Sequence, residues 1–344
     1  MKIPFLSIQK LISRLLMTMA CGVMMVSCDN LVYDDLEACE VEYRVKFRYD
    51  YNMKYADAFP HEVRSVTLFV FDENGRFVLQ QTEKGDVLAD KDYTMGIELL
   101  PGKYDFITWA GLENQESFTV PVLTEGVSTM QDLTCRMNRE HVDGEDKVGY
   151  LQPLWHGTAE LFVSESKNEA GTFTVVVPLI KDTNTIRIIL QQLSDTPIDV
   201  DHFDFVIKDN NGYMAHDNRL LEDVALKYYP YHRATGSAEA GTQGDDLLNV
   251  AVAELSIGRL VETQNPQLTI TNRENGEVVF SIPLIKYLSV CKTVANYDMA
   301  LQEYLDREDE YVMHFFLDED NEWINTQIII NDWIVRYNDI TPEF

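Results

Sequence analysis

The chain has 344 residues, of which 45% are hydrophobic and 25% charged, and its 57 acidic side chains against 28 basic ones give a formal net charge of −29. So acidic a protein is poorly suited to nucleic acid or to anionic membrane surfaces, because basic side chains bind phosphate groups. The length allows two hydrophobic cores of ordinary size, so two domains are expected.

Residues 1–27 have the pattern of an export signal. Three basic residues, Lys2, Lys10 and Arg14, precede the apolar run from Leu15 to Val26. A basic segment followed by a short apolar segment and small residues is typical of a signal peptide. The run is shorter than the roughly 20 residues that a membrane-spanning helix needs. We therefore expect residues 1–27 to be removed from an exported protein.

Cys28 is the expected first residue of the mature chain. The sequence Met25-Val26-Ser27-Cys28 resembles the lipobox at which lipoprotein signal peptidase cuts before a diacylated cysteine. Acyl chains bind a bilayer with about 0.8 kcal/mol for each buried CH₂, so two or three chains hold a protein stably. Cys21 is a competing site, but cleavage there would halve the apolar run. An ordinary secretory signal with a chance cysteine is the alternative.

Residues 28–38 are predicted to be an acidic tether behind the lipid. They contain Asp29, Asp34, Asp35 and Glu37, and Glu40 follows. This pattern resembles the acidic signal that directs lipoproteins to the outer face of the outer membrane in Bacteroidales. A solvated spacer explains the same charges equally well.

The first half of the mature chain, residues 39–168, is predicted to be an antiparallel β-sandwich. Apolar and charged residues alternate from Val41 to Tyr49, which is the period of a half-buried strand. Residues 63–71 and 76–81 are read as a hairpin around Asn74-Gly75. Further strands are expected at residues 97–100, 104–109, 120–123 and 159–163.

The second half, residues 169–344, is predicted to be another β-sandwich with one short helix. Strands are expected at residues 173–180, 185–190, 203–207, 268–271, 278–284, 311–317, 324–330 and 333–337, with a turn at 181–184. The helix is expected where Val294, Tyr297, Leu301, Tyr304 and Leu305 recur at helical spacing. Residues 228–246 have the composition of a long mobile loop. The fold class is therefore mostly β.

Several blocks of sequence resemble the fimbrial anchor subunits of Bacteroidales. In the first half they are the strand that follows Cys39, Leu68-Phe69-Val70-Phe71-Asp72, Leu100-Pro101-Gly102-Lys103-Tyr104 and Trp109-Ala110-Gly111-Leu112. In the second half they are Glu303-Tyr304-Leu305-Asp306-Arg307, Phe315-Phe316-Leu317 and Ile330-Asn331-Asp332-Trp333. The blocks occur in order over nearly the whole mature chain, so together they are specific.

This resemblance implies two tandem transthyretin-like sandwich domains and a role in type V pili. The partners would be fimbrial pilin subunits and the outer membrane, and no cofactor is expected. Subunits of that family join by β-strand addition, in which an inserted strand gains main-chain hydrogen bonds and its alternate side chains fill pockets. An anchor in that family keeps its lipid, whereas the polymerising pilins lose an N-terminal segment to proteolysis.

The C-terminal run is the segment that we expect to take part in strand exchange. Its candidate residues are Ile328, Ile329, Ile330, Trp333 and Val335. An ordinary last strand, paired within its own domain, is the simpler interpretation, and the strand at residues 41–49 is a second candidate. Arg44 and Arg48 lie inside that regular strand, where a protease could not reach them, which favours retention of the lipid.

Three cysteines follow Cys28. Disulfides persist in exported proteins, so one bridge among Cys39, Cys135 and Cys291 is expected, with one thiol left over. We favour Cys39 with Cys135, because these two residues open and close the first domain. Cys291 stands in an apolar stretch and is read as a small buried residue.

No catalytic constellation or metal-binding spacing is found in the sequence. The seven histidines lack zinc-site spacing, and no nucleophile elbow or phosphate loop occurs. Acid pairs such as Asp245-Asp246 are expected by chance among 57 acids. The alternating Asp318, Asp320 and Glu322 are read as an acidic turn, not a calcium loop. The protein is therefore predicted not to be an enzyme and to bind no metal.

A surface glycan-binding lipoprotein of a nutrient-uptake system is the alternative function. Tyr228, Tyr229, Tyr231 and His232 lie together in the sequence and are able to stack on a sugar ring. In a β protein, aromatic residues more often pack in the core or under loops.

Overall fold

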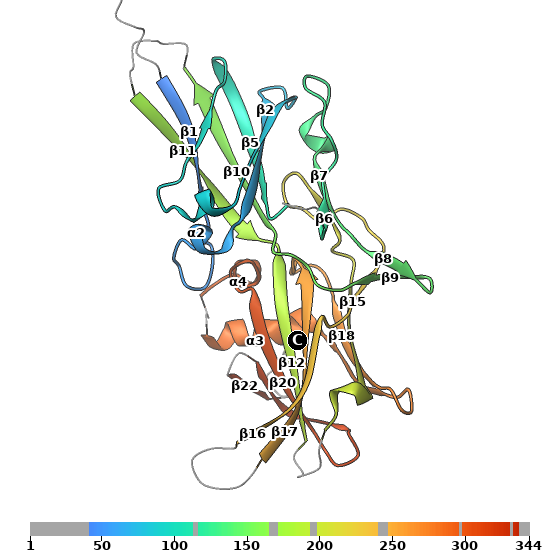
Figure 1. The fold of residues 1–344 in the computed structure, drawn as a ribbon. Coiled ribbons are helices and arrows are strands. Elements are labelled where there is room, and N and C mark those ends of the chain that lie inside the picture. The colour runs from blue at the N-terminus through green and yellow to red at the C-terminus, as the bar shows by residue number, and fades with distance from the viewer. Residues whose placement is uncertain are drawn as a thin grey trace, which may run out of the picture. The chain divides into compact units, whose positions relative to one another are not determined.

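The computed structural model describes residues 41–112, 116–164, 171–192, 198–239, 247–295, 298–330 and 333–336. These residues are mostly in β-strands (Figure 1). Residues 43–163 and 174–344 form one compact unit, and the other unit, residues 1–42 with 164–173, is described only in small part. Among the described residues, every helix is too short or too polar to cross a membrane.

The first half of the chain is built on a seven-stranded sheet. Its order is β3 (Phe77–Lys84), β2 (Ser65–Asp72), β5 (Gly102–Ala110), β10 (Trp155–Val163), β11 (Gly171–Lys181), β1 (Val41–Arg48) and β4 (Met95–Ile97). The predicted hairpin is confirmed, because β2 and β3 pair antiparallel on either side of Gly75, whose φ is 69°. Only a glycine adopts this left-handed conformation readily, so the turn fixes the register of the hairpin.

β2 is buried on both of its faces. Phe69 and Phe71 belong to the same hydrophobic cluster as Leu133 and Cys135, which stand next to or within a small sheet. That three-stranded sheet has the order β14 (Tyr213–Ala215), β7 (Thr134–Met137) and β6 (Phe118–Thr119). Val66, Leu68 and Val70 alternate with these residues along β2, point to the opposite face and are fully buried as well. A continuous apolar run is the expected sequence of such a doubly covered strand.

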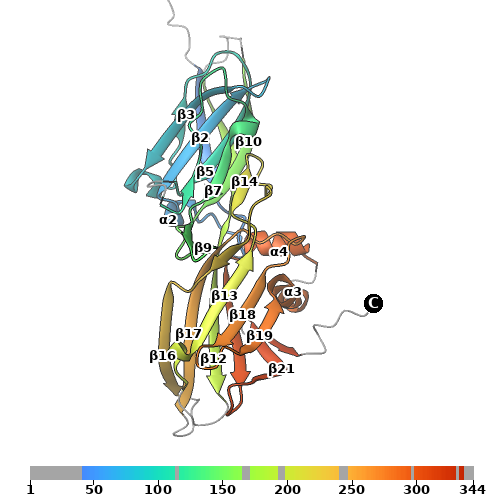
Figure 2. The ribbon, with the colours of Figure 1, turned by 90° about the vertical axis from the view of Figure 1, so that its right-hand side faces the viewer.

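Two six-stranded sheets form the second half (Figure 2). One has the order β16 (His232–Glu239), β17 (Leu247–Gly258), β12 (Thr183–Gln192), β20 (Glu310–Leu317), β21 (Trp323–Ile330) and β22 (Trp333–Arg336). The other has the order β19 (Val278–Pro283), β18 (Gln267–Asn272), β13 (Phe203–Asp209), β15 (Leu226–Tyr228), β9 (Glu145–Val148) and β8 (Glu140–Val142).

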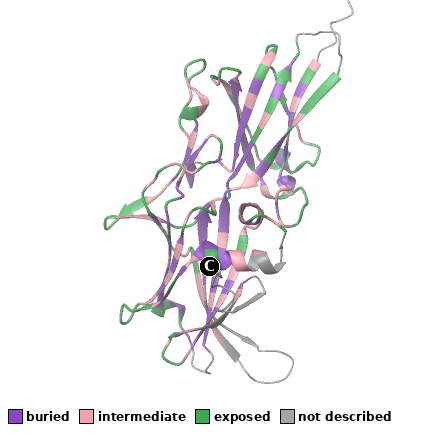
Figure 3. Cartoon of the chain, turned by 180° about the vertical axis from the view of Figure 1, so that it is seen from behind, coloured by how far each residue is buried: buried purple, intermediate pink, exposed green. Residues whose placement is uncertain are grey.

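The inner faces of these two sheets meet in one core. Ile186, Ile188 and Leu190 of β12 alternate toward it, and Phe203 and Phe205 of β13 belong to the same cluster. In Figure 3, buried residues recur along the described strands of the second half. Alternation of buried and exposed residues along both sheets is the signature of a sandwich.

The two halves share strands. β8 and β9 precede β10 in the chain but lie in a sheet of the second half, where β9 runs parallel to β15. Conversely, β14 follows β13 but pairs with β7 of the first half. The main hydrophobic cluster consequently includes residues of both halves, whereas Val45, Leu68 and Phe106 of the seven-stranded sheet are buried outside it.

The helices differ from the prediction of a single one. The structure has a short α2 (Phe59–Glu62) in the first half, and α3 (Leu284–Ala295) and α4 (Leu301–Arg307) in the second. Single 3₁₀ turns occur at Asp86–Ala89, Met130–Asp132 and Val200–His202. The predicted stripe from Val294 to Leu305 therefore spans parts of two helices. Asn296 and Asp298 interrupt it in the sequence, since Asn and Asp compete for backbone hydrogen bonds and favour helix ends.

Two other expectations need correction or stay open. The mobile loop predicted at residues 228–246 is wrong for residues 232–239, which form β16 and pair with β17. Small residues are tolerated there because β16 is an edge strand. The predicted boundary between residues 168 and 169 lies outside the described residues and stays a prediction. The chain changes sheets at Asp182, the one residue between β11 and β12.

We predict that Gly111→Ala destabilises the protein by more than its backbone conformation alone accounts for. Gly111 has a φ of 95°, and an added Cβ would lie 2.0 Å from the carbonyl oxygen of Pro153. A left-handed residue costs about 1–2 kcal/mol and overpacking about 1–3 kcal/mol, so we expect a total loss of about 2–5 kcal/mol. Urea unfolding of the leaderless chain measures it.

Gly126→Ala is the matched control. Its φ is 69°, but no atom lies within 4 Å of the position that an added Cβ would take. This variant isolates the conformational cost and should lose only about 1–2 kcal/mol. Equal losses in the two variants would show that the close approach of Pro153 is unimportant.

Candidate functional site

The C-terminal strands form one edge of a six-stranded sheet. β21 lies between β20 and β22 and is antiparallel to both. Ile328, Ile329 and Ile330, three of the candidates for strand exchange, are in β21, and Trp333 and Val335 are in β22. β22 pairs with β21 through four residue pairs and ends the strand order of this sheet. Within the described chain, the far side of β22 is thus the open side of the sheet.

The side chains of β21 show how this edge is held. Ile330 is fully buried and Ile329 is half-buried. The positions of the Ile328, Trp333 and Val335 side chains lie outside what the structure describes. An isoleucine-rich run favours extended backbone, because branching at Cβ restricts the side chain in a helix and packs well on a pleated surface. β21 is thus an interior strand of its sheet, and β22 is the last strand in the sheet order.

The N-terminal strand β1 lies inside the seven-stranded sheet. Tyr43, Val45 and Phe47 are buried in alternation, as the sequence predicted. The Arg44 Nη1 donates to Thr94 Oγ1 at 3.0 Å, and Arg48 forms an ion pair with Asp50. Backbone in a paired strand is a poor protease substrate because it must first leave the sheet.

Of the predicted cysteine sites, only Cys135 is among the described residues. Cys28 and Cys39 lie outside the described residues. Cys135, in β7, has a free and fully buried thiol. Burial raises the pKa of this thiol well above its ordinary value, so it is an unreactive core residue as it stands. A bridge between Cys39 and Cys135 stays a prediction.

The chain passes between its two halves through a buried polar group, which we name the junction cluster: Asp182, Asn218, Arg259 and Asp306. Asn218 donates its amide to Asp182 Oδ1 at 2.8 Å, and Arg259 Nε lies 3.7 Å from the same oxygen. Arg259 also donates to both oxygens of Asp306, at 2.9–3.0 Å. Its Nη1 donates to the carbonyl of Asn218 at 2.7 Å.

Burial dominates the electrostatics of the junction cluster. Asp182 is completely buried, and desolvation raises its pKa to about 7 even though Arg259 and Asn218 favour the charged form. A buried carboxylate keeps its proton more tightly because the ionised form loses its hydration. The sequence suggested only a turn at residues 181–184. A lone Asp between two β-branched runs was the one available signal that this connection is special.

Neighbouring contacts strengthen the same junction. Lys181 Nζ donates to Glu62 Oε2 at 3.1 Å and also pairs with Asp309. The guanidinium of Arg307 lies 3.9 Å from the ring centre of Tyr51, and its carbonyl accepts from Met53 N at 3.1 Å. Charged side chains from the second half thus hold segments of the first half in place.

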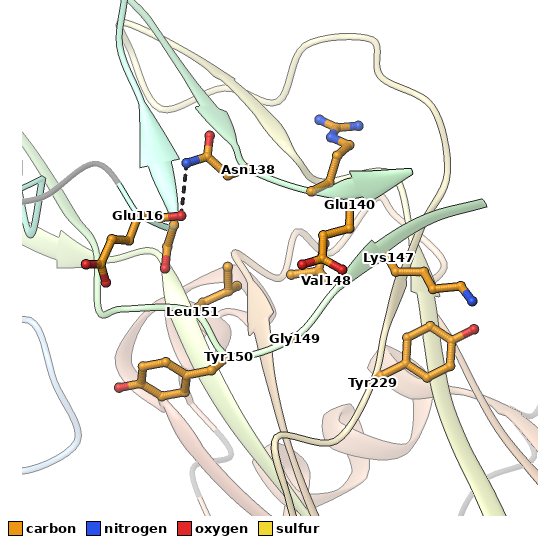
Figure 4. A pocket seen from close by; sticks show the side chains of 11 residues that line it. Glu116, Asn138, Glu140, Lys147, Val148, Gly149, Tyr150, Leu151 and Tyr229 are labelled. Atoms are coloured by element: carbon orange, nitrogen blue, oxygen red, sulfur yellow. Dashed lines mark hydrogen bonds between the residues drawn. The ribbon is translucent and has the colours of Figure 1, made fainter. Parts of the chain in front are cut away.

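A cleft of about 490 Å³ lies beside β8 and β9 (Figure 4). It is lined by Glu116, Ser117, Asn138, Arg139, Glu140, Lys147, Val148, Gly149, Tyr150, Leu151 and Tyr229. A second cleft of about 280 Å³ is lined by Glu62, Arg64, Ser65, Gly111, Tyr150, Gln152, Pro153 and Trp155. Tyr150 lines both clefts, and its side chain is 58% exposed. The sequence does not predict that Tyr150 lies between two clefts, because a single tyrosine in a polar loop belongs to no periodic pattern.

The aromatic group predicted at residues 228–232 does not form a single site. Tyr228 is fully buried, and its hydroxyl bonds to Asn211 Oδ1, because alternation along β15 turns it into the core. Tyr229 points the other way and lines the larger cleft. Tyr231 is 39% exposed and packs edge-on against Tyr150, with ring centres 5.1 Å apart. His232 is exposed.

The acidic groups weighed as ligands or catalysts are engaged otherwise. Asp318 Oδ1 accepts from the backbone N–H groups of Asp320 and Glu322, at 3.0 and 2.8 Å, so this segment is an acidic turn. Asp306 pairs with Arg259, and Asp245-Asp246 lie outside the described residues. Within the described ranges, no group of three metal-ligating side chains is present.

Comparison with known proteins identifies the family. The sequence profile of the fimbrillin-A associated anchor proteins Mfa1 and Mfa2 matches residues 36–339. The chain belongs to this anchor family. The resemblance found in the sequence blocks is thereby confirmed, and so is the mostly β fold. The anchor family consists of structural subunits of fimbriae and is not a family of enzymes.

Individual relatives agree with this membership. The chain is 21% identical to the minor fimbrium anchoring subunit Mfa2 of Porphyromonas gingivalis, over 97% of this chain and 98% of that protein. A crystal structure of a candidate adhesin from Bacteroides thetaiotaomicron is 36% identical, with a TM-score of 0.77 over 86% of this chain and 97% of that one. The fimbrial anchor protein Mfa2 from P. gingivalis has the same fold, with a TM-score of 0.64 and 16% identity over 87% of this chain and 99% of that one.

We predict that the wild-type chain becomes less stable as the pH rises because Asp182 ionises, and that Asp182→Asn abolishes this pH dependence. The folded-state pKa of Asp182, about 7, lies above its ordinary value of 3.8, so the folded state binds the proton more tightly. Its contribution to stability therefore falls as the pH rises from about 4 to about 7 and stays low above that. With about 1.4 kcal/mol per pKa unit over the roughly two units from pH 5 to the folded-state pKa, the variant should gain about 3 kcal/mol on the wild type between pH 5 and pH 8.

The measurement is urea unfolding of both proteins at pH 5, 6, 7 and 8. Burial also raises the pKa of Glu308 to about 7 and that of Asp209 to about 6, so only the difference between variant and wild type reports on Asp182. Asp217→Asn, an exposed change on the neighbouring turn, is the control and should leave the pH profile unchanged. A constant difference between Asp182→Asn and wild type at all four pH values would contradict a raised pKa.

Proposed function

We propose that this protein is an outer-membrane lipoprotein that anchors, or caps, a type V fimbrium at the cell surface. In this proposal Cys28 carries the lipid, residues 28–38 form the tether, and the C-terminal edge exchanges a strand with a pilin subunit. Membership of the anchor family supports the fimbrial role. The single observation that carries the strand exchange is the position of β22 at the end of its sheet order.

The physics of an edge strand supports this role for β22. A strand with one unpaired side offers N–H and C=O groups to an added strand, and proteins normally protect such edges. β22 is four residues long and pairs with β21 alone in the described chain. It therefore costs few hydrogen bonds to displace or to extend. An added strand would also gain side-chain contacts at alternate positions.

The state of β1 supports retention of the lipid. Because β1 is interior to its sheet and both of its arginines are engaged, cleavage at Arg44 or Arg48 would require the strand to unfold from the sheet. The sequence between Cys28 and β1 contains no arginine, so cleavage after an arginine would have to occur within β1 itself. An anchor needs this continuity between lipid and fold.

We expect Cys28→Ala to abolish incorporation of radiolabelled palmitate into this protein in the native host. The reason is that the thiol of the lipobox cysteine is the group that receives the diacylglyceryl lipid. Cys21→Ala is the matched control and should label normally. Undiminished labelling of Cys28→Ala would move the lipid to another residue, and loss of labelling in Cys21→Ala alone would assign it to Cys21.

A pair of truncations tests the strand exchange. A chain ending at residue 332 lacks β22, whereas a chain ending at residue 336 keeps it. We expect the shorter chain to remain membrane-bound but to retain less than about a tenth of the cell-attached fimbriae, since the main-chain hydrogen bonds of the exchanged strand would be lost. The longer chain should anchor fimbriae normally.

Immunogold counting of fimbriae on cells and in the medium gives the readout. Normal fimbriation with the shorter chain would show that β22 takes no part in assembly. Loss of fimbriae with both chains would assign the exchange to residues after 336 instead of β22.

A further inference from the structure

Tyr150 is an exposed aromatic residue that stands between two clefts. It lines both the cleft of about 490 Å³ and the cleft of about 280 Å³. The larger volume falls within the roughly 300–1,000 Å³ typical of small-molecule sites. Its ring is held by the edge-on contact with Tyr231 and is exposed beside the two clefts, where a ligand would cover it.

We propose that the two clefts form one groove that binds a neutral oligosaccharide, with Tyr150 at its centre. Figure 4 shows Tyr150 and Tyr229 on opposite sides of Gly149, with Glu116 and Glu140 around the same hollow. Rings that flank a hollow offer flat apolar faces to the C–H faces of pyranose rings, and carboxylates accept hydrogen bonds from the hydroxyl groups.

The aromatic walls are held in position before any ligand arrives. Tyr150 meets Tyr231 edge-on, with an angle of 73° between the rings. Tyr229 has the ammonium group of Lys147 5.5 Å from its ring centre. Rings fixed in this way lose little conformational entropy on binding, which favours recognition of a weakly interacting ligand such as a sugar.

Polar groups join the two clefts into one groove. Glu116 lines the larger cleft, and its Oε2 accepts a hydrogen bond at 2.9 Å from Gln152 Nε2, which lines the smaller cleft. Asn138 donates to the carbonyl of Glu116 at 2.9 Å and fixes that wall (Figure 4). An extended groove of this kind suits several linked sugar units more than a single one.

The charges favour a neutral ligand. The protein carries a net charge of −29, and Glu116 and Glu140 stand at the groove itself. The basic residues there are already engaged, because Arg139 donates to both oxygens of Asp223, at 3.2 and 2.6 Å. Lys147 lies 3.9 Å from Asp143. A uronate or sulfated polymer would therefore be repelled.

Titration calorimetry of the full chain carrying Cys28→Ala tests the proposal. The probes are hexasaccharides from mannan, β-glucan, xylan and galactan, with hexagalacturonate as the anionic comparison and a lysine-rich decapeptide as the alternative ligand class. We expect at least one neutral hexasaccharide to bind. Tyr150→Ala and Tyr229→Ala should each weaken that binding by about tenfold or more, equivalent to about 1.4 kcal/mol of lost contact.

Phe162→Ala is the matched control, because Phe162 is 72% exposed on β10 and lines neither cleft. It should bind like the unmodified chain, and thermal unfolding should show that all variants are folded. The proposal is overturned if no neutral hexasaccharide binds, if binding survives both tyrosine changes, or if only the anionic hexamer or the peptide binds. Fimbrial anchoring by these variants is measured separately, so that this result and the proposed function fail independently.

Discussion

The buried polar contact at Asp182 is the constraint on which the arrangement of this protein depends. One residue separates β11 from β12, so the chain has no slack with which to move the two halves apart. That residue brings a carboxyl group into a fully buried site, where hydrogen bonds and opposite charge offset its lost hydration. Asn218 donates a hydrogen bond to it, and Arg259, itself held by Asp306, lies 3.7 Å away. The short connection thus places Asp182 inside the protein, and the polar contacts of Asp182 in turn hold the two halves at this point.

The shared strands extend this constraint over the whole described chain. β8 and β9 leave the first half to complete a sheet of the second, and β14 returns to pair with β7. Residues from both halves consequently belong to one hydrophobic cluster. A core that is continuous in this way favours cooperative unfolding, in contrast to independent domains joined by a linker.

Much of the strand content was predictable from sequence, because period-two alternation is a local signal. β1 is an example: its alternating Tyr43, Val45 and Phe47 indicated both the strand and its buried face. The pairing of β9 with β15 and of β14 with β7, which links the two halves, was not predictable. Partners far apart in the sequence leave no trace in the local periodicity. β16 was mistaken for a loop because an edge strand tolerates Gly, Ala and Ser.

The candidate site shows the same division. Tyr229 lines a cleft, whereas Tyr228, which the sequence analysis grouped with it, is turned into the core by the alternation along β15. Tyr150 and Asp182 were missed, because their importance arises from what the fold brings beside them. The family, by contrast, was recognisable from several ordered blocks of sequence.

The number of residue pairs in each strand pairing has a mechanical meaning. β22 is held by four pairs, whereas β12 is held by nine to β17 and by eight to β20. A pull applied at the C-terminus reaches β22 first, and few hydrogen bonds resist it there. Tension applied to this protein from that end would detach β22 first. The longer pairings of the central strand β12 would bear the force only after that.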